Sequence, residues 1–221
     1  MVVDGEFLPA SPTEMLAKSN HKTNFNLLVS TVEDEASFLL QFSQHHAAFR
    51  KENPESISLQ EAKDYLLDIL TSQILKTPVP NDTISRIYFN GLNANLDSAD
   101  LFRKQVSIAY GDVFFSCPTL EFAKAVFRSS PDTVKVYQWY YKAKLGKQKL
   151  MCGRWTGACH LNEIYPVFGL PFRNRKMYHN REREISQEVI SFIKAFLKNG
   201  SVIVKTITAH VQTHVLFKQE T

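Results

Sequence analysis

Residues 24–42, NFNLLVSTVEDEASFLLQF, are the stretch that decides the fold. Residues 24–30 form a short apolar run with the length of a buried strand, and such near-continuous runs are typical of parallel sheets. Residues 31–35 are polar and acidic, and residues 36–42 return to apolar side chains at helical spacing. A strand, an acidic loop and a helix in this order indicate an α/β architecture.

The rest of the chain adds one strong strand and several helices. Residues 134–141 are rich in β-branched and aromatic side chains, which predicts a second strand. Ser58 and Glu61 form a capping box at the start of one helix, and Ser116-Cys117-Pro118 predicts the start of another. Helices are expected over residues 59–75, 83–92, 97–110, from 116 to 129, and over 185–199, where Asn199-Gly200 ends the last one.

Composition places the chain among ordinary globular proteins. It has 221 residues, a formal net charge of +4, 44% hydrophobic residues and 12% aromatic residues, which excludes disorder. The small basic excess is spread along the chain, so we expect no nucleic-acid partner. No apolar run reaches the length of a membrane span, and the first residues lack the pattern of a signal peptide.

The acidic cluster Glu33-Asp34-Glu35 is the first candidate site. It follows a predicted strand directly, and in doubly wound folds ligands and catalytic groups gather at the carboxyl ends of strands. Acids at the start of a helix also stabilise its macrodipole without any catalytic role. The pattern alone favours this second interpretation.

His160 is the second candidate, and it gains meaning from its order relative to Glu35. An isolated histidine is usually structural, but α/β-hydrolases order their triad as Ser, then Asp or Glu, then His. The acid of such a triad holds the imidazole and stabilises the imidazolium. No Gly-x-Ser-x-Gly elbow occurs in the chain, and no run of glycines could form an oxyanion hole.

A metal site is the second kind of chemistry that the sequence suggests. Cys152, Cys159 and His160 lie close together in the sequence, but their spacing matches no zinc pattern. We therefore expect neither a metal nor a cofactor.

These pieces together resemble the type-B carboxylesterase family, and particularly its cholinesterase branch. Four segments carry the resemblance and run in order along residues 2–200: VDGEFLP at 3–9, LLVSTVEDEASF at 27–38, DVFFSCP at 112–118, and GACHLNEIYPVFGLP at 157–171. The resemblance implies the C-terminal portion of an α/β-hydrolase, with few parallel strands flanked by many helices. Residues 1–200 would form this partial domain, and residues 201–221 a divergent tail.

The resemblance also assigns roles to single residues. Glu35 would be the triad acid and His160 the general base. Phe38 falls where cholinesterases place an aromatic ring at the choline site, in position for a cation–π contact, and Leu39 falls at the acyl pocket. The substrate would be a choline ester or another carboxylic ester, and longer relatives form homodimers. Ala36 and Leu161 stand where the family has glycine.

The cysteines and the location follow the same reasoning. In relatives the cysteine equivalent to Cys117 is bridged to one near the C-terminus, but no cysteine follows Cys159 here. Cys152 and Cys159 could pair locally, although the sequence leaves the connectivity open. The family implies a secreted or membrane-anchored protein, in which Asn81 and Asn199 would be glycosylation acceptors.

The expected function is therefore that of a piece of a serine ester hydrolase. The chain would supply the triad acid and histidine but no nucleophile, and would be inactive alone. The missing signal peptide is then expected to lie in an absent N-terminal part. The alternative is a non-catalytic, cholinesterase-like interaction or adhesion domain, or a truncated gene product.

Overall fold

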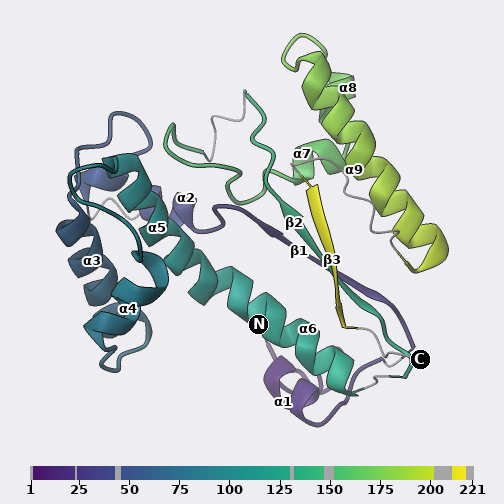
Figure 1. Cartoon of the computed structure of the whole chain (residues 1–221). Helices are drawn as coiled ribbons and strands as arrows, with labels where there is room; N and C mark the ends of the chain where they lie inside the picture. The colour runs from purple at the N-terminus through teal and green to yellow at the C-terminus, as the bar shows by residue number, and fades with distance from the viewer. Residues whose placement is uncertain are drawn as a thin grey trace.

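The computed structural model describes residues 2–22, 24–42, 46–129, 132–146, 152–201 and the backbone of 211–217, without the side chain of residue 73. Most of the tail expected at 201–221 therefore lies outside the described residues. The elements, shown in Figure 1, are α1 (Pro12–Ala17), β1 (Leu27–Val32), α2 (Ser37–Phe42), the 3₁₀ turn η1 (Ala47–Phe49), α3 (Leu59–Asp68), the π-helical turn η2 (Ile69–Ile74), α4 (Asn81–Tyr88), α5 (Ala99–Gly111), the π-helical turn η3 (Asp112–Ser116), α6 (Cys117–Ser129), β2 (Val136–Tyr141), α7 (Ile164–Val167), α8 (Leu170–Arg173), α9 (Asn180–Asn199) and β3 (Val211–Phe217).

The described strands form one sheet in the order β1-β2-β3. β1 and β2 are parallel, with Leu27 opposite Val136 and Val32 opposite Tyr141. This confirms the parallel pair that the sequence predicts. β3 pairs with β2 in the antiparallel direction, and this strand was not among those predicted.

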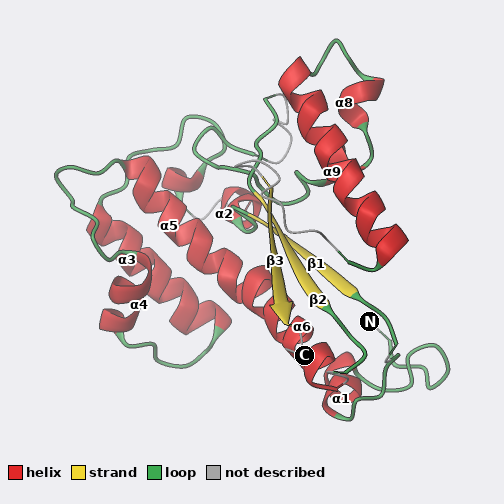
Figure 2. Ribbon diagram, turned by 45° about the vertical axis from the view of Figure 1, so that its right-hand side comes forward, coloured by secondary structure: helices red, strands yellow, loops and turns green. Residues whose placement is uncertain are grey.

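Helices cover both faces of the sheet, as Figures 1 and 2 show. On one face Tyr137, Trp139 and Tyr141 of β2 pack in a cluster with Val189 and Phe192 of α9. The opposite face packs against α6 in a second cluster, formed by Val29, Ala123, Val126, Val134 and Val136. Burial of both faces explains why β1 and β2 show no clear polar alternation.

A third cluster lies beside the sheet, where α2, α3, α4 and α5 meet. It includes Phe49, which is fully buried. Arg103 of α5 is also buried. The Arg103 guanidinium donates to the carbonyls of Ala48 at 2.9 Å and Glu55 at 2.6 Å. These bonds fix the loop that follows α2 against α5.

The predicted helix start at Ser116 is wrong. α5, η3 and α6 follow one another without a break, since Gly111, Asp112 and Cys117 all have right-handed helical backbone angles. The N–H of Cys117 donates to the Asp112 carbonyl, five residues back. This π-helical turn widens the helix just before Pro118, which explains how the chain takes a proline there without ending the helix.

Other helix ends agree with the sequence. Ser58 and Glu61 form the predicted capping box of α3, with the Ser58 N–H donating to Glu61 at 2.7 Å. α9 ends at Asn199, and Gly200 adopts the left-handed φ of 63° that such an end favours.

Candidate active site

Two loops meet at the carboxyl ends of β1 and β2. The loop after β1 carries Glu33, Asp34 and Glu35, and the loop that precedes α7 carries Cys159 and His160. Asp34 and Cys159 form an isolated parallel β-bridge, and the Asp34 N–H donates to the Ala158 carbonyl at 2.8 Å. The two sequence candidates are therefore brought together.

The central contact joins Glu35 and His160. Glu35 Oε2 lies 2.6 Å from His160 Nδ1, and Glu35 Oε1 accepts a hydrogen bond from the Val32 N–H at 2.8 Å. The Glu35 side chain is 8% exposed and that of His160 is 29% exposed. The carboxylate thus holds one imidazole nitrogen, and the other, Nε2, has no hydrogen-bond partner among the described residues.

This geometry argues against the helix-capping interpretation of the acids. α2 carries no acidic residue in its first turn. Glu35 instead bonds back to the end of β1 and across to His160.

Neighbouring groups shift the protonation equilibrium of His160. The hydrogen bond that Glu35 accepts from His160 raises the pKa of His160, and the negative charges of Glu35 and Glu163 act in the same direction, whereas burial opposes them. Burial raises the pKa of Glu163 as well, with the charge of Glu35 adding to it. The charges of two carboxyl groups therefore act on one imidazole.

Two aromatic rings cover the imidazole. Phe38, from α2, stacks on His160 with centroids 4.9 Å apart and planes 16° apart. Phe115, from η3, approaches at 4.8 Å with a tilt of 43°. Phe115 lies in the segment that carried the family resemblance, but its role was missed because only the fold brings η3 to His160. Leu39 is half-buried beside Phe38 in α2.

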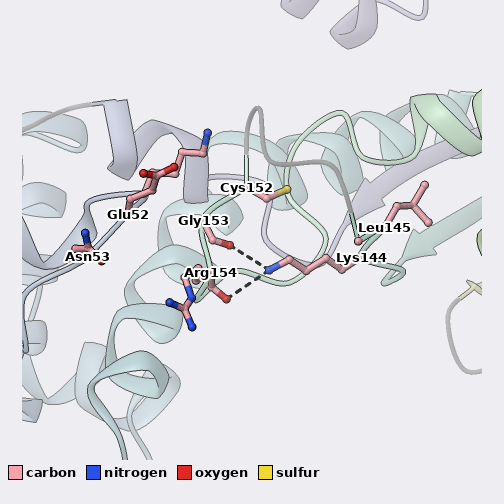
Figure 3. Close-up of a pocket in the computed structure, with 9 residues that line it drawn as sticks. Glu52, Asn53, Lys144, Leu145, Cys152, Gly153 and Arg154 are labelled. Carbon is pink, nitrogen blue, oxygen red and sulfur yellow. Dashed lines mark hydrogen bonds between the residues drawn. The ribbon is translucent and has the colours of Figure 1, made fainter. Parts of the chain in front are cut away.

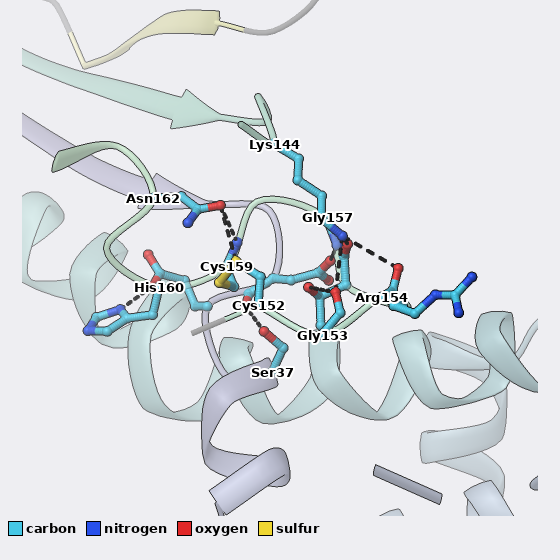
Figure 4. Close-up of a disulfide and its surroundings, with 12 residues drawn as sticks. Ser37, Lys144, Cys152, Gly153, Arg154, Gly157, Cys159, His160 and Asn162 are labelled. Carbon is cyan, nitrogen blue, oxygen red and sulfur yellow. Dashed lines mark hydrogen bonds and ion pairs between the residues drawn. A yellow bond between two sulfur atoms is a disulfide. The ribbon is translucent and has the colours of Figure 1, made fainter. Parts of the chain in front are cut away.

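A disulfide ties the histidine loop, as Figure 4 shows. Cys152 and Cys159 are joined, with Cα atoms 5.6 Å apart, and both are buried. The Cys159 N–H also donates to Asn162 Oδ1 at 3.2 Å. The two cysteines considered as metal ligands are thus bonded to each other, and Cys117 is free and exposed.

The two replaced glycines have different surroundings. Ala36 is completely buried. Leu161 has a φ of 69°, the left-handed region that favours glycine, and its side chain is partly exposed. The backbone after His160 therefore keeps a glycine-like conformation although the residue is leucine.

Two cavities lie near these loops. One of about 180 Å³ is lined by Glu35 together with Glu33, Asp112, Ser116 and Tyr140 among others. A larger pocket of about 530 Å³, shown in Figure 3, is lined by Lys51, Glu52, Asn53, Lys144, Leu145, Gly146, Cys152, Gly153 and Arg154. Lys144 in this pocket donates to the carbonyls of Gly153 and Thr156, at 3.1 and 2.6 Å, so its ammonium is hydrogen-bonded to nearby backbone.

The remaining predicted residues lie on the surface. Asn81 begins α4 and Asn199 ends α9, and both are exposed. Among the described residues no three His, Cys, Asp or Glu side chains group as metal ligands. None of the described helices is long and apolar enough to cross a membrane.

Several known proteins are similar to this chain. The model of the carboxylesterase family matches residues 1–212. The chain is 25% identical to an acetylcholinesterase of Leptinotarsa decemlineata over 91% of its length, 27% to one of Bungarus fasciatus over 90%, and 26% to acetylcholinesterase 4 of Caenorhabditis briggsae over 84%. It spans only 30–32% of the length of these relatives.

Proposed function

Because the chain belongs to the carboxylesterase family, we propose that it supplies the acid, Glu35, and the general base, His160, of a serine esterase triad. The observation that carries the proposal is the 2.6 Å contact between Glu35 Oε2 and His160 Nδ1. A carboxylate on Nδ1 fixes the tautomer and orientation that leave Nε2 ready to accept a proton.

The reaction would be the hydrolysis of a carboxylic ester. His160 Nε2 takes the proton of a serine hydroxyl as it attacks the ester carbonyl, and returns that proton to the leaving alcohol. Glu35 stabilises the imidazolium between the two transfers. The raised pKa of His160 reflects the same stabilisation in the absence of substrate.

The serine would come from outside these 221 residues. No Gly-x-Ser-x-Gly occurs in the sequence, and the relatives are about three times as long as the chain. The chain alone would then be inactive, because its sequence contains neither a Gly-x-Ser-x-Gly elbow nor a run of glycines for an oxyanion hole.

The substrate class is a choline ester or a related carboxylic ester. Phe38 and Phe115 put two aromatic faces at His160, and such faces attract a quaternary ammonium. Leu39, next to Phe38, would line the acyl pocket. The relatives named acetylcholinesterase support this choice.

The protein would act in an oxidising compartment, secreted or anchored at the cell surface. The buried Cys152–Cys159 bond supports this, since structural disulfides persist there. Asn81 and Asn199 would then be glycosylated. A homodimer of the complete protein stays a prediction from the family resemblance.

The acid–base pair is tested by NMR titration of the purified chain. We expect the pKa of His160, identified from the signal that is lost in His160→Gln, to lie above about 6.5 and to fall in Glu35→Gln. An ordinary pKa that does not respond to Glu35→Gln would show that the pair does not form.

The missing nucleophile is tested with esters and a fluorophosphonate probe. The chain should neither hydrolyse acetylthiocholine or a nitrophenyl ester nor be labelled by the probe. Turnover that is lost in His160→Ala would show that the chain holds its own nucleophile.

A non-catalytic interaction domain is the second candidate, and the absence of an elbow and of oxyanion glycines favours it. A chimera separates the two. In the chimera, this chain replaces the segment of the Bungarus fasciatus acetylcholinesterase that it matches, which is 31% of the length of that protein. Ester hydrolysis by the folded chimera, lost in Glu35→Gln and His160→Gln, supports the esterase, and a folded but inactive chimera supports the interaction domain.

A further inference from the structure

Asp34 occupies a special place between the two loops of the site. It immediately precedes Glu35, and its bridge partner Cys159 immediately precedes His160. The acid and the base are therefore the next residues along two parallel segments that are paired at Asp34. Whatever fixes Asp34 against the histidine loop also fixes the register in which Glu35 meets His160.

The contacts of Asp34 reach both loops. Its N–H donates to the Ala158 carbonyl at 2.8 Å, and its Oδ2 accepts a short hydrogen bond from the Gly157 N–H. Its carbonyl accepts from the Ser37 hydroxyl at 2.8 Å, which ties the loop to the start of α2. Side chain and backbone of one residue thus link three segments.

Gly157 permits this close approach. A Cβ atom at Gly157 would lie 2.8 Å from Asp34 Oδ2 and 2.1 Å from Glu33 Oε2. The histidine loop therefore passes directly over the carboxyl group of Asp34.

The carboxyl group is kept at this place although burial is unfavourable for it. Asp34 is 0% exposed and its Oδ1 has no partner among the described residues. The ammonium of Lys104, in α5, lies 3.8 Å from Oδ2 and bonds Glu33 at 3.1 Å. Burial raises the pKa of Asp34, opposed by Lys104 and by the Gly157 N–H. Stability alone does not account for a buried, half-satisfied carboxyl group.

We propose that Asp34 is a positioning residue that fixes the histidine loop to the acid loop, so that Glu35 and His160 meet. The inference rests on the proposed function, in which that pair is the acid and base of a triad. The acceptor oxygen is what matters, since either a carboxylate or a neutral carbonyl oxygen can accept from the Gly157 N–H. A shift of about 1 Å between the loops would break a side-chain hydrogen bond such as that of Glu35 with His160.

The pKa of His160 reports whether Glu35 lies next to the imidazole, which a measurement of stability does not. The hydrogen bond with Glu35 is the largest cause of the raised pKa, so a displacement of Glu35 from His160 lowers it. Asp34→Ala and Asp34→Asn both remove the charge of Asp34, and only Asp34→Asn keeps an acceptor oxygen, so a difference between the two variants reports position and not charge. The experiment titrates His160 by NMR in the complete chain and in Asp34→Ala, Asp34→Asn, Glu33→Gln and Glu35→Gln. Thermal melts confirm that each variant is folded.

Asp34→Ala should lower the pKa of His160 by at least about half of the fall that Glu35→Gln produces. Asp34→Asn keeps an acceptor oxygen and should retain the wild-type value. Glu33→Gln is the matched control, because it removes a neighbouring carboxylate that also pairs with Lys104, and it should leave His160 unchanged.

A folded Asp34→Ala chain with the wild-type pKa of His160 would overturn the inference while the pair itself stands. If Asp34→Ala does not fold, Asp34→Asn decides: retention of the pKa supports the inference, and a fall contradicts it. If the wild-type pKa does not respond to Glu35→Gln, the proposed function itself fails.

Discussion

His160 is the residue whose protonation its neighbours control most directly. Its Nδ1 bonds Glu35, and this bond raises its pKa above the ordinary value of about 6.5. At pH values between the pKa of His160 in the unfolded chain and its pKa in the folded chain, the folded chain holds a proton that the unfolded chain has released. The stability that the pair contributes is therefore fully present below about pH 6.5 and is lost as the pH rises through the folded pKa.

The first prediction follows from that sign. When the pH is raised from about 6 to about 8.5, the free energy of unfolding should fall more in the wild-type chain than in His160→Gln. Urea unfolding at the two pH values measures this fall. Asp34, whose pKa burial raises, is present in both chains and cancels in the comparison. The charge of His160 lowers the pKa of Glu163, so both chains also carry Glu163→Gln. Equal losses in the two chains would mean that His160 is not held by Glu35 in solution.

Leu161 gives a second prediction at this scale. Its φ of 69° costs a leucine roughly 1–2 kcal/mol, and a β-branched side chain more. Leu161→Gly should stabilise the chain by about 0.5–1 kcal/mol after the added entropy of glycine is counted, whereas Leu161→Val should destabilise it. Urea midpoints measure both, and a less stable glycine variant would contradict the assigned backbone conformation.

Among the elements, the loop between β2 and α7 depends on its disulfide. Removing the Cys152–Cys159 bond releases a loop of about eight residues, which costs about 2.5 kcal/mol on the loop-entropy model. The double variant Cys152→Ala, Cys159→Ala should lower the free energy of unfolding by about that amount. Cys117→Ser is the matched control and should change stability by less than about 0.5 kcal/mol, because Cys117 is free and exposed. A double variant as stable as the control would contradict the prediction.

Local sequence signals predicted a helix end correctly where the bonds that form that end are local. The capping box at Ser58 and the stop at Gly200 are confirmed because they use bonds within a few residues. Ser116-Cys117-Pro118 has the same kind of signal, yet the helix continues through it. A π-helical turn depends on how η3 packs between α5 and α6, which residue types near Pro118 do not encode.

At the scale of the whole molecule, the α/β class and the partial α/β-hydrolase are confirmed. Glu35 and His160 are far apart in sequence. Their order along the chain matches that of an α/β-hydrolase triad, and the family resemblance assigned them the roles of acid and base. The bridge between Asp34 and Cys159 and the stacking of Phe115 on His160 were not predicted. Both depend on long-range packing of loops, for which a single sequence carries no periodic signal.

The outer edge of β1 is a further property of the whole molecule. Among the described residues, β1 pairs only with β2. The Glu33 N–H points toward β2 and donates to the Tyr141 carbonyl at 3.0 Å. The N–H of the preceding residue, Val32, points away from β2 and donates to the Glu35 side chain. Backbone groups alternate along a parallel strand, so the N–H of Ser30 also points outward and is available to another strand.

This edge predicts self-association of the isolated chain. Ser30→Pro removes an outward N–H and leaves the bonds to β2, so it should reduce association and preserve a cooperative melt. Thr31→Pro is the matched control: it removes an N–H that faces β2 from a buried residue, and should destabilise the fold by at least about 2 kcal/mol. Light scattering after size exclusion measures the association, and urea unfolding measures stability. A wild-type chain that stays monomeric at high concentration, or a Ser30→Pro chain that associates equally, would show that the β1 edge is not the site of association.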